Sequence, residues 1–215
     1  MEGIEKYLFM RPLLGLLAQG RFFRHVVAMA IRAGAALVVL FSLTTFFQAG
    51  KLTFELPAQG IPGAVLFEVL FVLGVYAVVH VMLIRARDVD QLSVNDFYAI
   101  PLGAILVRML GEIYAVFVGL VSIGGGLFVW FTNQGVGKVL NPLVRALFPT
   151  MRDNPSFMGG IEFMVSGMLA GLGVLIAAYV VSEILALFAR LAVREAQPQR
   201  SAQSVEPIYR SRFGS

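Results

Sequence analysis

The chain of 215 residues contains no cysteine, and only 14% of its residues are charged. The absence of cysteine excludes disulfides, thiolate metal sites and palmitoyl anchors. Soluble domains carry about a quarter charged residues, whereas this chain is 58% hydrophobic and has a mean hydropathy of +0.81. A soluble fold cannot bury that much apolar surface, so the composition indicates a protein whose solvent is lipid.

Chemical motifs are scarce as well. His25 and His80, the two histidines, lie on different segments without an HExxH pattern, so neither a zinc site nor a bis-histidine haem is predicted. The serines lack a nucleophile-elbow context, and the glycine run at 124–126 lies in an apolar span rather than in a phosphate-binding loop. We expect no enzymatic activity, no cofactor and no metal.

Long apolar runs are abundant. A helix needs about 20 apolar residues to cross a bilayer, and four segments qualify: Val26 to Phe47, Ile61 to Ile84, Phe97 to Phe131 and Ile161 to Leu187. Such runs are helical because lipid offers the backbone no other hydrogen-bond partners. The sequence therefore predicts an all-α polytopic membrane protein with four transmembrane helices.

Charge asymmetry predicts the orientation. The two termini and the connection between the second and third spans hold eleven Lys and Arg residues, against four in the other two connections. Basic residues favour the cytoplasmic side, so both termini are expected there. The net charge of +4 arises largely from the termini. It suits anionic lipid head groups rather than nucleic acid.

Four regions follow along the chain. Residues 1–25 are predicted to be a cytoplasmic amphipathic segment lying on the membrane surface. A first membrane hairpin covers 26–92, and a second covers 93–195 with an outer loop at 132–160. In that loop "NPLVRALF" predicts a short interfacial helix with Asn141 as its cap. The polar tail at 196–215 has the composition of a disordered segment.

The two hairpins show an internal repeat. "YAVVHVMLIRAR" (76–87) aligns without gaps with "YVVSEILALFAR" (179–190), which pairs Tyr76 with Tyr179 and His80 with Glu183. The other two spans align more weakly, with Arg32 opposite Arg108. The repeat predicts two hairpins of equal orientation, related by a pseudo-twofold axis along the membrane normal.

One resemblance accompanies the repeat. "GRFFRHVVAMAIR" at the entry of the first span, and a returning span that ends in Glu183 and Arg190, resemble a family of small uncharacterised bacterial membrane hairpins. His80 replaces the glutamate in the first half. The resemblance implies two tandem copies and a location in the bacterial inner membrane. The family has no established activity.

Ionisable residues inside the spans are the candidate functional site. Charges there normally face protein or water, and the repeat predicts one cluster in the cytoplasmic half. Arg108 and Glu112 share a helix face and are expected to offset each other, with Glu183 as a further partner. The predicted cluster comprises Arg32, His80, Arg108, Glu112 and Glu183. It either locks the helices together or forms an ion or proton relay.

Glycines supply the predicted packing surface. Gly167 and Gly171 form a GxxxG pair on the fourth span, and Gly124, Gly125 and Gly126 leave part of the third span without side chains. Small residues let membrane helices approach closely, and packing within the chain is favoured over a dimer interface.

Two functions remain open at this point. The first is an accessory or scaffold subunit that assembles with itself or with other membrane subunits among membrane lipids. The alternative is a small ion- or proton-coupled transporter or channel that uses the charges of the inner half.

Overall fold

The computed structural model describes the chain apart from residues 1–20, 93–98, 149–154 and 214–215, and it describes residues 192–213 by their backbone. The expected segment 1–25 therefore lies almost wholly outside the described residues. The long helices are α2 (Arg21–Glu55), α3 (Ile61–Asp90), α4 (Ala99–Thr132) and α6 (Phe157–Phe213). Between α4 and α6 lie the short helices η2 (Val136–Lys138) and α5 (Pro142–Arg145).

All four long helices are long and apolar enough to cross a membrane. The described residues form helices and connections, with no strand among them. The prediction of an all-α protein with four candidate membrane spans is confirmed.

Helix α4 is continuous through Pro101 and through the three glycines at 124–126. Pro101 lies in the first turn, where a missing N–H costs no helical hydrogen bond. The three glycines stay helical because neighbouring side chains fill the space beside them. With 34 residues, α4 measures about 51 Å, and the hydrocarbon core of a bilayer about 30 Å. The helix must therefore tilt or project beyond the lipid.

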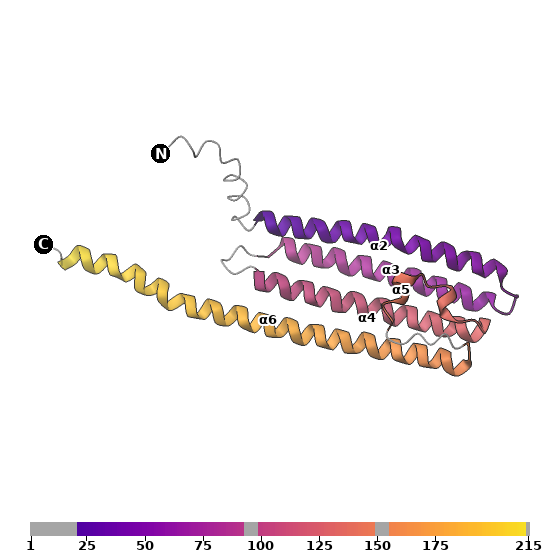
Figure 1. Cartoon of the computed structure of the whole chain (residues 1–215). Coiled ribbons are helices and arrows are strands. Elements are labelled where there is room, and N and C mark those ends of the chain that lie inside the picture. The colour runs from indigo at the N-terminus through magenta and orange to yellow at the C-terminus, as the bar shows by residue number, and fades with distance from the viewer. Residues whose placement is uncertain (1–20, 93–98, 149–154, 214–215) are drawn as a thin grey trace, which may run out of the picture.

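The four long helices form a row rather than a closed bundle (Figure 1). Helix α2 packs on α3, α3 on α4 and α4 on α6, while α2 and α6 share no comparable interface among the described residues. A twofold axis relating the hairpins would turn the α3–α4 contact into an α6–α2 contact. The expected pseudo-twofold arrangement is therefore wrong, and the hairpins follow one another along the row.

Burial follows from this arrangement. The most apolar stretch of α4, which has neighbours on both sides, is 44% buried, whereas that of the edge helix α6 is 6% buried. The core lies between α3 and α4, where the fully buried rings of Phe67 and Phe128 lie 6.0 Å apart. Exposed apolar side chains cover the outer faces of α2 and α6, as lipid contact requires.

The loop segment 133–148 folds back along one face of the row instead of staying at the helix ends (Figure 1). Asn141 caps α5 by accepting a hydrogen bond from the Val144 amide, and its own amide donates to the buried Thr45 of α2 at 2.8 Å. Thr45 lies ten residues before the end of α2, about 15 Å along its axis. The segment therefore lies alongside the helices, about 15 Å from the loop end of α2.

Further contacts pin this segment across the row. The Gln48 side chain donates to the Lys138 carbonyl, and the Tyr114 hydroxyl donates to the Leu147 carbonyl at 2.9 Å. The ring of Phe148 stacks on Phe163 of α6. The segment thus ties α2, α4 and α6 together at the loop end, where α2 and α6 themselves do not pack.

The C-terminal tail differs from its expected disorder. Helix α6 continues without interruption to Phe213, well past the end of its apolar part at Leu191. Ala, Glu, Gln and Arg are frequent after Leu191 and have high helix propensity. In Figure 1 this arm projects beyond the other helices.

Candidate functional site

An ion pair links α3 to α4. Arg85 lies five residues before the end of α3, and its guanidinium donates through two nitrogens to both carboxylate oxygens of Glu112, with Nε 2.9 Å from Oε2. Nη1 of Arg85 also donates to Asp88 at 2.8 Å. Bidentate arginine–carboxylate pairs are among the stronger polar contacts. Both partners of the Arg85–Glu112 pair are mostly shielded, with side chains 21% and 16% exposed.

A second set of contacts links α4 to α6. Nε of Arg108 donates to the Ser182 hydroxyl at 2.7 Å, and Nη2 of Arg108 lies 3.2 Å from Glu183. The Arg108 guanidinium also lies 5.2 Å from the ring centre of Tyr179, within cation–π range. The Tyr179 hydroxyl donates to Glu112 at 2.8 Å, so the two sets join through one tyrosine.

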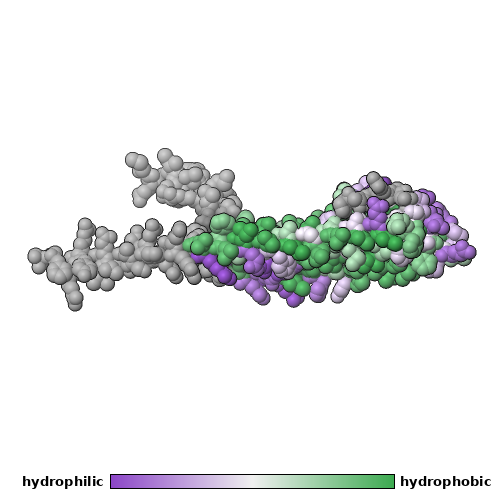
Figure 2. Space-filling view, turned by 90° about the horizontal axis from the view of Figure 1, so that it is seen from below, coloured by the Kyte–Doolittle hydropathy of each residue, from purple (hydrophilic) through white to green (hydrophobic). Residues whose placement is uncertain are grey.

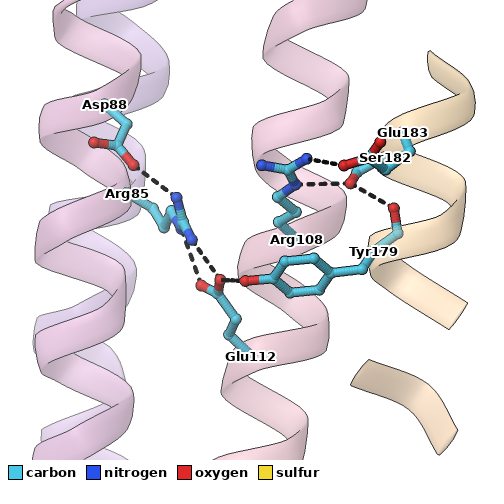
Figure 3. Close-up of polar contacts among 7 residues, drawn as sticks. All are labelled: Arg85, Asp88, Arg108, Glu112, Tyr179, Ser182 and Glu183. Atoms are coloured by element: carbon cyan, nitrogen blue, oxygen red, sulfur yellow. Dashed lines mark hydrogen bonds and ion pairs between the residues drawn. The ribbon is translucent and has the colours of Figure 1, made fainter. Parts of the chain in front are cut away.

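Together these residues form a continuous polar brace from α3 across α4 to α6 (Figure 3). We use that name for the following side chains: Asp88, Arg85, Glu112, Tyr179, Arg108, Ser182 and Glu183. At full ionisation the brace holds two cations and three anions. Glu183 is its most open member, with a side chain 71% exposed.

The remaining members of the expected cluster lie elsewhere. Arg32 of α2 forms an ion pair with Asp90 at the end of α3, and His25 lies 3.7 Å from the same carboxylate. His80 is exposed and stacks on the ring of Tyr76. The structure thus brings Arg108, Glu112 and Glu183 into one network and leaves Arg32 and His80 outside it.

The partner expected for Glu112 needs correction. Arg108 shares a helix with Glu112, but the carboxylate bonds to Arg85 from the neighbouring helix and to Tyr179. Arginine ahead of glutamate is the weaker order for a pair four residues apart, and Ser182 offers Arg108 a buried acceptor. Pairing across helices satisfies both arginines.

The depth of the brace explains why charges occur in such apolar helices. Arg108 lies 22 residues before Trp130, and Tyr179 lies 22 residues after Phe157, or about 33 Å in each helix. Trp130 and Phe157 stack on each other at the loop end, and aromatic residues favour membrane interfaces. With these rings at one interface, the brace lies at the opposite one, about 30 Å away.

An apolar groove of about 760 Å³ lies along the row. All four long helices line it, for example through Val38 of α2, Val78 of α3, Val107 of α4 and Ala177 of α6. At the loop end it is lined by Leu143, Val144 and Leu147, in and just after α5. Among the described residues α2 and α6 share no comparable interface, and the groove opens between them.

The groove and the polar brace lie on opposite faces of the row. On α4, Glu112 follows Val107 by five residues, which is a rotation of about 140°. The edge-on space-filling view shows hydrophilic residues along the lower edge of the row and hydrophobic residues over its middle (Figure 2). The charges therefore do not line the groove.

The predicted packing glycines all lie at helix interfaces. Gly126 faces Met164 and Gly160 of α6, Gly167 faces Ser122 and Gly171 faces Ala115. Gly125 faces Phe163, whereas Gly124 faces α3 at Phe67 and Leu70. These contacts lie within one chain.

Several members of the site were not foreseen. The second apolar run ends at Ile84, so Arg85, Asp88 and Asp90 were expected in the connection that follows it. The signal that could have found them is the continuation of helical spacing from the second span through Asp90. Tyr179 appeared in the repeat, but no spacing rule connects it with Glu112 on another helix.

Comparisons with family models, curated proteins and solved structures found no match to this chain.

Proposed function

We propose that this protein is an accessory or scaffold subunit of the bacterial inner membrane, which assembles with itself or with a larger membrane complex and catalyses no reaction. The observation that carries the proposal is the edge helix α6. The most apolar stretch of its span is 6% buried within the chain, yet it carries the exposed Glu183, and the helix continues as an arm beyond the lipid.

The row of helices supports this role. Each edge of the row offers a whole helix face to lipid or to a neighbouring subunit, while α3 and α4 each have a packed neighbour on both sides. A closed bundle would bury most of these faces. An open row is suited to lateral association.

The proposed orientation places both termini in the cytoplasm. The excess of Lys and Arg at the terminal end supports it. In that orientation the polar brace faces the cytoplasmic head groups, and the α6 arm reaches into the cytoplasm. The five Arg residues from Arg190 to the end of the chain, four of them in the arm, can meet acidic partners or anionic lipid there.

The alternative function, transport by a single chain, has less support than the scaffold role. The charged side chains of the brace bond to one another on one face of the row, while the groove on the other face is apolar. An ion path needs polar groups or water along its length, and the described side chains of this chain do not supply one along the groove.

Native extraction followed by mass spectrometry tests the proposal. The full chain should leave the membrane as a defined oligomer or with partner subunits in fixed ratio, and a chain ending at Leu191 should lose at least part of that assembly. A chain whose arm is replaced by a Gly–Ser linker of equal length is the control for length. Release of a bare monomer from native membrane contradicts the proposal.

A flux assay tests the alternative. Vesicles containing the purified chain should show no flux under a proton or cation gradient, and Glu183→Gln should leave that result unchanged. Flux that depends on pH and disappears in Glu183→Gln or His80→Ala would establish the transporter instead.

A further inference from the structure

Among the described residues that line the apolar groove, the polar side chains are all hydrogen-bonded within the chain. Of its polar lining residues, Tyr114 donates its hydroxyl to the Leu147 carbonyl, Ser42 donates to the Val39 carbonyl, and Asn141 bonds to Val144 and Thr45. A ligand with a polar group at this depth would find these donors engaged. The walls therefore select hydrocarbon.

The groove opens sideways, because no comparable packing joins α2 and α6 among the described residues. Apart from the residues of the loop segment 133–148, its lining residues lie in the four candidate membrane spans. In a bilayer the material beside this opening is acyl chain. Leaving the groove empty would forfeit the dispersion contacts of its lining.

The length of the groove distinguishes between hydrocarbon occupants. On α4 it runs from Val107, at the level of the polar brace but on the opposite face, to Val118, which is about 17 Å. The side chains of Leu143, Val144 and Leu147 line its loop end. A transmembrane helix of a partner or of a second copy needs about 30 Å of uninterrupted surface. The groove supplies about half of that, the depth of one leaflet.

We propose that the groove is a binding site for one acyl chain of a phospholipid from the leaflet on the terminal side. The chain enters between α2 and α6, with its ester end near the level of Val107 and its methyl end against the segment that contains α5. The bound lipid fills the space between the two edge helices and becomes part of the packed structure.

Ala177 offers a variant that fills the groove. It is exposed and lines the groove on α6, so Ala177→Phe places a ring in the space of the acyl chain. Val180 lies on the same helix, is exposed and does not line the groove. Val180→Phe is therefore the matched control for an added ring on a lipid-facing surface.

The first test measures lipid retention. The full chain is reconstituted in nanodiscs of equal parts phosphatidylethanolamine and phosphatidylglycerol, extracted in detergent and weighed by native mass spectrometry. Wild type and Val180→Phe should retain one phospholipid. Its affinity should fall about tenfold in Ala177→Phe, in line with the cost of overpacking a site. Equal retention in all three chains would overturn the proposal.

A second test needs no variant of the groove. A phosphatidylcholine with a diazirine in the middle of one acyl chain is added to nanodiscs of the wild-type chain and photolysed. Cross-links should concentrate on groove residues such as Val78 and Tyr114. Cross-links spread evenly over exposed residues such as Val180 and Leu169 indicate bulk lipid only. A second copy or a partner protein seated in the groove would exclude the probe, and either result contradicts the proposal.

Discussion

The two hairpins carry matched arginines, yet these form different contacts. In the first hairpin Arg32 reaches Asp90 near the end of α3, an ion pair in which the side chains are 42% and 29% exposed. In the second, Arg108 bonds to the buried Ser182, pairs with Glu183 and lies against Tyr179. A sequence repeat can therefore keep its charges and still build two different interfaces.

Packing shows the same difference. Glycines bring α4 and α6 together, because methyl groups at Gly126 or Gly167 would overlap with atoms of the opposite helix. In the first hairpin Gly34 faces only the flexible end of Met82, and Gly50 has ordinary space beside it. The second hairpin is close-packed near its backbone, and the first relies on side chains that can shift.

The largest effect should come from a methyl group between α4 and α6. Gly126→Ala places a Cβ 2.8 Å from the Gly160 carbonyl oxygen as well as against Met164. Overpacking of this kind costs about 1–3 kcal/mol, and backbone cannot move aside as a side chain can. We expect the free energy of unfolding in mixed SDS–detergent micelles to fall by about 2–3 kcal/mol.

Gly119→Ala is the control for that substitution. It lies on the same helix, and a Cβ there meets nothing within 4 Å. Alanine in place of glycine in a helix stabilises by up to about 1 kcal/mol. The two substitutions should therefore act in opposite directions, and equal effects would contradict close packing at Gly126.

The second-largest decrease in the free energy of unfolding is expected from Arg108→Met, which tests one of the two matched arginines. Arg108→Met removes the donor to Ser182 and the ion-pair partner of Glu183, and hydrogen bonds of charged groups contribute about 1.5–3 kcal/mol when shielded. Because Glu183 is largely exposed, we expect the free energy of unfolding in the same assay to fall by only about 1–2 kcal/mol.

Arg32→Met provides the comparison from the first hairpin. Its ion pair with Asp90 has side chains 42% and 29% exposed, and exposed pairs contribute about 0–1 kcal/mol. Arg108, by contrast, also bonds to the buried Ser182. If Arg32→Met lowers the free energy of unfolding as much as Arg108→Met does, the two arginines are energetically equivalent despite their different contacts.

A smaller effect is expected from the matched tyrosines. Tyr179→Phe removes the hydroxyl that donates to Glu112, which should reduce the free energy of unfolding by about 1 kcal/mol. Tyr76→Phe retains the ring that stacks on His80 and should change stability by less than about 0.5 kcal/mol. Similar losses in both variants would contradict a brace that runs through Tyr179.

The sequence predicted the features that depend on local patterns. Apolar runs defined four spans, and small-residue spacing placed Gly167 and Gly171 at an interface. The choice of partners depends on which helices are neighbours, and hydropathy carries no information about that. Arg85 was therefore missed as the partner of Glu112. The row arrangement was missed because the repeat suggested a twofold axis between the hairpins. That axis would require an α2–α6 interface equivalent to the one between α3 and α4, and the described residues form no comparable one.

The smallest effect should come from Gly34→Ala, which tests the first hairpin in the same way as Gly126→Ala tests the second. A Cβ at Gly34 would lie 3.1 Å from the terminal methyl group of Met82, and methionine adapts easily because it is unbranched and flexible. The helix-propensity gain of up to about 1 kcal/mol and the cost of shifting Met82 should nearly cancel, leaving the unfolding free energy within about 0.5 kcal/mol of wild type. In Gly34→Ala combined with Met82→Leu, the shorter side chain should relieve the contact and expose the propensity gain. If Gly34→Ala alone is as damaging as Gly126→Ala, the first hairpin is as rigidly packed as the second, and the two hairpins differ only in their polar contacts.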